Sequence, residues 1–112
     1  MSDNREVEAL KAVAHPARLR ILQTLRTGEL NVGDIEGATE IGQPALSQQL
    51  AVLRKAGLVT TRKQAKLVYY RLAQAEFDRL AALMSSLGSG VGTISQPRRN
   101  PTPGVANFAR LS

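Results

Sequence analysis

The sequence predicts a mainly α-helical domain that contains one small β-hairpin. Apolar residues recur at three- and four-residue spacing along most of residues 5–87, which is typical of helices packed on a core. Residues 58–72 instead contain two short runs rich in β-forming residues, which favour a hairpin. The chain has 112 residues, of which 43% are hydrophobic, so we expect a single domain with a small core.

The domain is expected to occupy residues 1–87 and to be followed by a distinct C-terminal tail, residues 88–112. Glycine and proline take seven of the last 25 positions. This composition is typical of an irregular or disordered segment. We therefore expect the folded domain to end near Leu87.

The first helix is predicted over the first dozen residues. Val7, Leu10 and Ala14 lie three or four positions apart, which is the spacing of one face of an amphipathic helix. Asp3 or Asn4 is expected to cap its N-terminus, because short polar side chains favour that position.

A break at His15-Pro16 separates this helix from the next one. The residue before a proline avoids the helical conformation, whereas Pro16 itself suits the first turn of a helix. Leucines at helical spacing then carry the second helix to a stop at Thr27-Gly28. His15 is accordingly interpreted as a helix-boundary residue rather than a metal ligand.

A third, short helix is predicted to start at Asn31, whose side chain can cap it. Gly33 and Gly37 lie inside this helix and weaken it by about 1 kcal/mol each relative to alanine. Residues 40–42 follow as a turn.

The fourth helix is predicted to start at Gln43-Pro44 and to stop at Gly57. Leu46, Leu50 and Leu53 form one apolar stripe along it, so this side is expected to face the core. The opposite side is slim and rich in hydrogen-bonding groups: Pro44, Ser47, Gln48, Ala51, Arg54 and Lys55.

The hairpin is predicted from residues 58–62 and 67–72, which are joined by a basic link over residues 63–66. A last helix follows over residues 74–87, with an apolar stripe spaced like that of a coiled coil. This stripe has two interpretations, a core-facing helix within one chain or the seam of a dimer.

Helix, helix, short helix, turn, helix, hairpin and helix is the element order of a winged helix-turn-helix domain with an extra helix at each end. In a helix-turn-helix the second helix enters the major groove, where serine, glutamine and arginine can bind base edges. A basic hairpin tip can reach the phosphate backbone. The predicted DNA-binding residues are Gln43, Ser47, Gln48, Gln49, Arg54, Arg62, Lys63 and Lys66.

The charge distribution supports nucleic-acid binding. The chain carries 15 Lys and Arg against 9 Asp and Glu, for a formal net charge of +6. Residues 43–72, which contain the fourth helix and the hairpin, hold six basic side chains and no acidic one. A polar or basic surface alone is more often a solvated face, but the joint occurrence of these features in one block favours a polyanion partner.

Other function classes are disfavoured. The chain has no cysteine and one histidine, which excludes thiol chemistry and a cysteine zinc site from these residues. No nucleophile-base arrangement or phosphate-binding glycine loop is present, so we expect no enzyme and no cofactor. No apolar run approaches the roughly 18 residues of a membrane span. We therefore expect a cytoplasmic, nucleoid-associated protein.

Four segments together resemble the ArsR/SmtB family of bacterial transcriptional repressors. They are AHPARLRIL at 14–22, LNVGDI at 30–35, PALSQQLAVLRKAGLV at 44–59 and VYYRL at 68–72. The resemblance extends in order and spacing over residues 5–87, and the SQQL stretch is similar to the subgroup that contains the biofilm-growth repressor, the vibrio haemolysin activator and the rhizobial nodulation repressor.

This resemblance implies a homodimer, paired through its terminal helices, that binds an inverted-repeat operator in a promoter and represses transcription. The expected dimer interface comprises Val7, Leu10, Leu80, Leu83, Met84 and Leu87. The alternative is a winged-helix dimer that acts as a protein-interaction module or anti-activator.

The sensing residues of the family do not carry over. Metal sensors place cysteines where this chain has residues 31–33, and others use Asp and His ligands on the last helix, which here offers Glu76 and Asp78 but no histidine. Dithiol sensors place cysteines at positions that align with Gln23 and roughly Ser89. The resemblance therefore implies a regulator without cysteine-based metal or redox sensing, and its inducer is unidentified.

Overall fold

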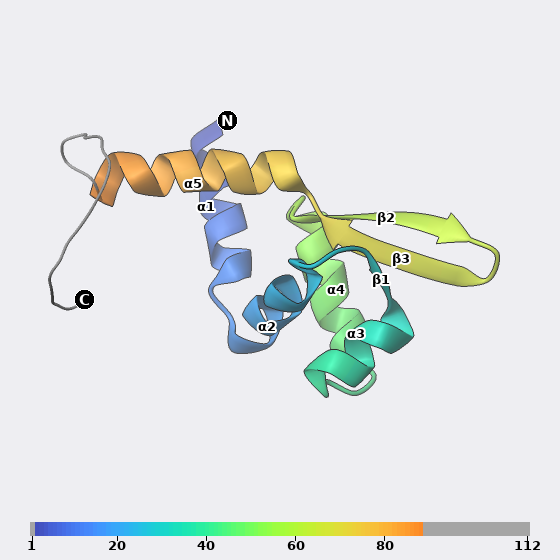
Figure 1. The fold of residues 1–112 in the computed structure, drawn as a ribbon. Coiled ribbons are helices and arrows are strands. Elements are labelled where there is room, and N and C mark those ends of the chain that lie inside the picture. The colour runs from blue at the N-terminus through green and yellow to red at the C-terminus, as the bar shows by residue number, and fades with distance from the viewer. Residues whose placement is uncertain (1, 89–112) are drawn as a thin grey trace, which may run out of the picture. The chain divides into compact units, whose positions relative to one another are not determined.

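The computed structural model describes residues 2–88, so the predicted tail beyond Gly88 lies outside the described residues. The chain divides into two units, the first ending at Leu80 and the second beginning at Ala81. The elements shown in Figure 1 are α1 (Ser2–Val13), α2 (Pro16–Leu25), β1 (Leu30–Asn31), α3 (Val32–Thr39), α4 (Ala45–Lys55), β2 (Val59–Gln64), β3 (Leu67–Leu72) and α5 (Gln74–Gly88). The predicted helix order and the hairpin are confirmed.

The break between α1 and α2 has the predicted cause. His15 is extended, with φ of −154°, and its Nδ1 accepts a hydrogen bond of 3.2 Å from the backbone N–H of Ala17. His15 is thus the N-cap of α2, which confirms its interpretation as a boundary residue. The predicted cap of α1 is wrong, because the helix begins at Ser2, so Asp3 and Asn4 already lie within it.

Hydrogen bonds between side chains and the backbone hold both ends of α3. Asn31 Oδ1 accepts the N–H of Asp34 at 2.8 Å, as predicted for the cap of α3. At the other end of α3, the buried hydroxyl of Thr39 donates to the carbonyl of Ile35 at 2.7 Å and accepts the N–H of Ile41 at 3.2 Å. The chain therefore leaves α3 in one direction, toward the start of α4.

The hairpin forms a three-stranded antiparallel sheet in the order β1-β3-β2. Gln64 pairs with Leu67, so the turn comprises only Ala65 and Lys66 and is shorter than the predicted four-residue link. The third strand was not predicted from the sequence. Leu30 of β1 pairs with Tyr70 of β3, but a two-residue strand is too short to produce a periodic signal.

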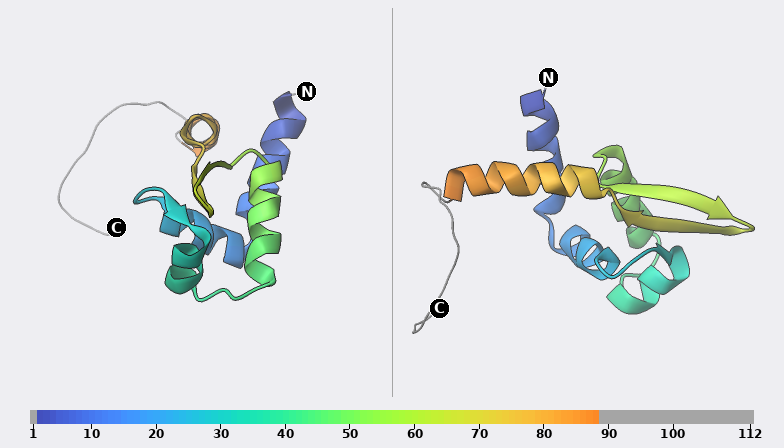
Figure 2. Two further views of the ribbon diagram at one scale, coloured as in Figure 1. Left: turned by 90° about the vertical axis from the view of Figure 1, so that its right-hand side faces the viewer. Right: turned by 45° about the horizontal axis from the view of Figure 1, so that its top comes forward.

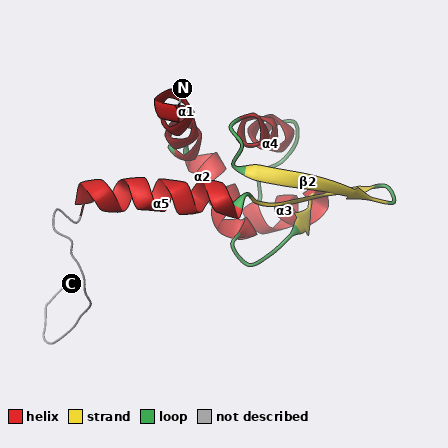
Figure 3. Cartoon of the chain, turned by 90° about the horizontal axis from the view of Figure 1, so that it is seen from above, coloured by secondary structure: helices red, strands yellow, loops and turns green. Residues whose placement is uncertain are grey.

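The core is built on the predicted leucine stripe of α4. Leu46 and Leu53 have no exposed surface and Leu50 is 2% exposed. They pack with buried residues of α2, α3, the sheet and the turn before β2, of which Ile21, Ile35 and Leu58 are fully buried. Figure 3 shows the two long strands between α4 on one side and α3 on the other, and Figure 2 shows α1 beside α4. Each fully buried side chain of this size contributes roughly 1.5–3 kcal/mol.

An ion cluster joins α1 to the first turns of α5. Glu76 is nearly buried and accepts hydrogen bonds from the guanidinium groups of both Arg5 and Arg79. These bonds, first that from Arg79, hold the pKa of Glu76 below its ordinary value. Leu80 lies one turn further on and is buried in the same core. The start of α5 is therefore anchored within the first unit.

Gly57 ends α4 in the way that the sequence predicts. Its φ is +79°, and its N–H donates to the carbonyl of Arg54 at 3.0 Å. The N–H of Leu58 donates to the carbonyl of Leu53, also at 3.0 Å. This is the Schellman arrangement, and the buried side chains of Leu53 and Leu58 supply its usual apolar contact. The turn directs the chain from α4 straight into β2.

Replacing Gly57 with alanine is expected to destabilise the fold by about 1–2 kcal/mol, because an L-residue at positive φ is strained. No atom lies within 4 Å of the added Cβ, so the loss of stability reports backbone strain without a steric clash. Gly37→Ala is the matched control. Gly37 is helical, exposed and equally open, so its substitution should stabilise the fold by up to about 1 kcal/mol. Urea denaturation measures both, and changes of the same sign would contradict the account.

Candidate nucleic-acid interface

The exposed side of α4 is the face opposite the leucine stripe. Ser47, Gln48, Ala51 and Arg54 are all exposed there. Ala51 carries no side chain beyond Cβ, so a partner can approach the helix backbone closely. A rigid helix that presents hydroxyl, amide and guanidinium groups around a small residue can insert into a DNA groove.

Gln43 is the side chain that holds the start of this face. Its Oε1 accepts the backbone N–H of Ser47 at 3.0 Å and the Ser47 hydroxyl at 2.7 Å. Pro44, the N-cap residue of α4, makes no side-chain cap of its own. Because a backbone N–H can only donate, the oxygen of the Gln43 amide must face Ser47. The amide nitrogen of Gln43 is therefore the end available to a partner, and it can only donate.

Gln49 lies apart from the other predicted DNA-binding residues of α4. It is half-buried, and its Oε1 accepts a hydrogen bond of 2.8 Å from the guanidinium of Arg18. Arg18 also donates to the carbonyl of Ala12 at 2.7 Å, at the end of α1. Gln49 thus takes part in a contact between α4, α2 and α1 rather than in the exposed face.

Arg62 on the hairpin is committed to the body of the protein. Its guanidinium makes two contacts of 2.8 Å with the carboxylate of Glu29 and lies 4.7 Å from the ring centroid of Tyr69. The hydrogen bond from Arg62 lowers the pKa of Glu29 below its ordinary value. This pair ties the hairpin to the loop between α2 and β1.

Lys63 and Lys66, by contrast, lie exposed at the end of the hairpin. Neither takes part in a salt bridge within the described residues. Their ammonium groups are therefore free to meet a phosphate. The three basic residues predicted on the hairpin thus divide into one that holds the hairpin and two at its tip.

The outer face of α4 and the sheet line one hollow of about 480 Å³. Ser47, Ala51 and Arg54 contribute one wall, and Val32 and Tyr70 contribute the other. A partner seated on α4 would therefore also meet the sheet. Tyr70 was not among the predicted DNA-binding residues, because the sequence placed it only within a strand of the hairpin, residues 67–72.

Besides Tyr70, three residues outside the predicted set shape this interface: Arg18, Glu29 and Tyr69. Arg18 and Glu29 act on partners 31 and 33 positions away in the chain. No local pattern in the sequence points to such distant pairs. The only available signal was that Glu29 is an acidic residue in a chain whose hairpin is basic.

The predicted dimer residues differ in exposure. Val7 is 46% exposed, Met84 54% and Leu87 73%, while Leu10 and Leu83 are half-buried. Leu80 is buried in the core of the single chain, in agreement with the interpretation of α5 as core-facing at that position. The apolar stripe of α5 therefore begins with a side chain that is buried in the core and ends with large apolar side chains that a single chain leaves exposed.

None of the helices within residues 2–88 has the length and apolar character needed to span a lipid bilayer. Over the same residues, no group of three or more His, Asp or Glu side chains is arranged to hold a metal ion.

A helix-turn-helix followed by a two-stranded wing defines a winged-helix protein of the kind that regulates transcription. Residues 15–61 match the family described as bacterial regulatory protein, arsR family. The chain belongs to this arsR family. The residues quoted above for the resemblance lie largely within that match, and the predicted family is confirmed.

Named relatives agree with this assignment. The biofilm growth-associated repressor of Agrobacterium fabrum is 53% identical over 78 residues, which cover 70% of this chain and 64% of that protein. The transcriptional activator HlyU of Vibrio cholerae is 45% identical over 83 residues, which cover 74% of this chain and 77% of that protein. Since the family and these relatives are regulators, the expectation that the chain is not an enzyme is confirmed.

A solved structure confirms the fold. The crystal structure of the transcriptional repressor BigR from Xylella fastidiosa superposes with a TM-score of 0.63 at 41% identity. The match covers 78% of this chain and 89% of that chain. The winged helix-turn-helix predicted from the order of elements is thus found in a relative.

Gln43→Ala is expected to destabilise the protein by about 1 kcal/mol, since it removes the side-chain cap from the first turn of α4. Gln48→Ala is the control, because Gln48 is exposed on the same helix and makes no side-chain hydrogen bond within residues 2–88. Its change should stay within about 0.5 kcal/mol. Thermal or urea unfolding measures both variants, and equal effects would show that Gln43 does not cap α4.

Proposed function

We propose that this protein binds double-stranded promoter DNA as a homodimer and represses transcription from an inverted-repeat operator. The observation that carries the proposal is α4. On one side of this helix the leucine side chains are at most 2% exposed. The other side exposes Ser47, Gln48 and Arg54, in a stretch of the chain without acidic residues. The names of the relatives, one a repressor and one an activator, support regulation of transcription.

Each polar residue of the interface has a role that fits its surroundings. Gln48 suits bidentate hydrogen bonding to adenine, and Arg54 suits guanine or a phosphate. Gln43 is a donor through its amide nitrogen, so it suits base acceptors or phosphate oxygens. Lys63 and Lys66 suit the phosphate backbone beside the groove, which fixes position without carrying sequence information.

In this proposal Gln49 and Arg62 do not contact DNA but hold the helix and the hairpin in position. Gln49 orients α4 through Arg18, and Arg62 orients the hairpin through Glu29. Neither side chain needs to leave its partner for the remaining residues to meet DNA.

The homodimer is inferred from large apolar side chains that one chain leaves exposed. Val7 on α1, together with Met84 and Leu87 on α5, would lose contact with water in an interface between two copies. An inverted repeat requires two recognition helices about one turn of DNA apart, roughly 34 Å, which only a dimer supplies.

The signal that releases the DNA is proposed to act without cysteine chemistry. The 112 residues contain no cysteine, so neither a thiolate metal site nor a disulfide switch can form from them. Repression is accordingly controlled by another ligand or by the amount of protein, in the cytoplasm where the nucleoid lies.

DNA binding is tested by measuring affinity for genomic promoter fragments and for random DNA over a range of salt concentrations. Gln48→Ala should lose about 1–3 kcal/mol on the operator alone, because it removes a base contact. Lys66→Ala should weaken binding to all DNA and reduce the slope of log K against log salt by about one per subunit. Uniform affinity for every sequence would refute an operator, and wild-type DNA binding by Gln48→Ala would favour a protein-interaction module.

Dimer formation is tested with Met84→Glu, which places a charge on an exposed apolar position of α5. The expected result is a monomer in sedimentation and joint loss of operator binding, because burying an unpaired charge in an interface is costly. Ser85→Glu is the control, since Ser85 is also exposed and adds the same charge one position away. A dimeric Met84→Glu variant would contradict the proposed interface.

A further inference from the structure

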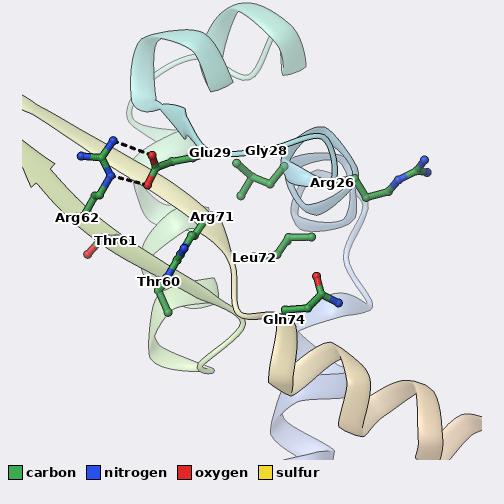
Figure 4. Close-up of a pocket in the computed structure, with 10 residues that line it drawn as sticks. Arg26, Gly28, Glu29, Thr60, Thr61, Arg62, Arg71, Leu72 and Gln74 are labelled. Atoms are coloured by element: carbon green, nitrogen blue, oxygen red, sulfur yellow. Dashed lines mark hydrogen bonds and ion pairs between the residues drawn. The ribbon is translucent and has the colours of Figure 1, made fainter.

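A second hollow lies between the end of α2 and the wing. Its volume is about 560 Å³, which falls in the range of small-molecule sites. The loop at Gly28 and Glu29 forms one side, and Thr60 and Arg71 of the paired strands form another. Figure 4 shows Gln74, at the start of α5, closing one end. None of these residues belongs to the outer face of α4.

Arg71 is the arginine that faces this hollow without a salt bridge within the described residues, because Arg26, which also lines it, points away from it in Figure 4. Arg62 also lines it, but its guanidinium is matched by Glu29 through the two contacts of 2.8 Å. Arg71 makes one side-chain hydrogen bond, from Nε to the Thr60 hydroxyl at 3.3 Å, and no salt bridge within residues 2–88. In Figure 4 its side chain lies among Thr60, Leu72 and Gln74. Its two terminal nitrogens are therefore available for the oxygens of a carboxylate or a phosphate.

The rest of the lining selects the kind of anion. Leu72, which is half-buried, provides an apolar surface next to Arg71, and the Thr60 hydroxyl and Gln74 amide add hydrogen-bonding groups. A DNA backbone fits poorly, because it would bring repeated phosphates against the Glu29 carboxylate and would leave Leu72 uncovered. A small molecule with one acidic end avoids both costs.

We propose that this hollow binds a small organic anion, whose carboxylate or phosphate group pairs with Arg71 and whose apolar body lies on Leu72. Thr60 and Arg71 belong to the wing, while Gly28 and Glu29 belong to the loop after α2. A bound anion would therefore fix the wing against the body of the protein. Its influence on operator affinity rests on the proposed function, but the binding itself does not require DNA.

The test is a titration of the isotope-labelled full chain, without DNA and at constant ionic strength, followed by amide NMR. The probes are butyrate, butyl phosphate and inorganic phosphate. We expect saturable shifts confined to the neighbourhood of Thr60, Arg71 and Gln74, with at least one organic anion binding about 10-fold tighter than inorganic phosphate. Which organic anion binds more tightly identifies the acidic group.

Variants that remove either a positive or a negative charge near the hollow test the site further. Arg71→Gln should weaken binding of the organic anion by about 10-fold or more, while Lys11→Gln, the same change of charge on α1, should leave it unchanged. Glu29→Gln should tighten binding by about 2- to 5-fold, since it removes a nearby negative charge. Unperturbed amide signals elsewhere establish that each variant is folded.

Three outcomes would overturn the proposal. They are shifts that do not saturate, equal binding by Arg71→Gln, and inorganic phosphate binding as tightly as both organic anions. If no anion binds while Arg71→Gln lowers the salt slope of DNA binding by about one per subunit, Arg71 contacts the DNA backbone instead. If the wild-type chain binds no operator, the proposed function is refuted, whereas the proposed anion site is unaffected.

Discussion

The burial of one side of α4 is the constraint on which the rest of the structure depends. Leu46, Leu50 and Leu53 lie together in the centre of the core, and replacing one of them with alanine would cost about 2–5 kcal/mol. A helix of 11 residues cannot rotate without exposing this stripe. Burial therefore fixes which residues face outward, and the chemistry of that outer face follows from the packing of the inner one.

The basic charge of the chain divides between structure and recognition. Arg5, Arg18, Arg62 and Arg79 are held by carboxylates, carbonyls or an amide of the same chain. Arg54, Lys63 and Lys66 form no salt bridge within the described residues. A count of basic residues thus overstates the charge that is free to meet DNA. The arginines that are bound internally set the positions of the helix and the wing that carry the free ones.

Local signals in the sequence were sufficient to predict most of the fold. The caps at His15 and Asn31, the stop at Gly57 and the leucine stripe of α4 each depend on neighbours within a few positions. The strand β1 and the pairing of Arg62 could not be predicted, because they depend on contacts with distant parts of the chain. The same limit applies to the interface: the helical spacing of the leucines in α4 indicated an outer face, but only the contact with Arg18 shows that Gln49 is turned away from it.

The central claim, that α4 meets DNA through the face opposite its buried stripe, is tested most directly by the side-chain amide signals of its glutamines. These signals would be recorded by ¹⁵N NMR before and after adding a promoter fragment that the protein retains. The account predicts large shifts for the amides of Gln43 and Gln48, which lie exposed, and little change for that of Gln49, whose oxygen is held by Arg18. A shift of Gln49 as large as that of Gln48, or no shift at all in these amides, would contradict it.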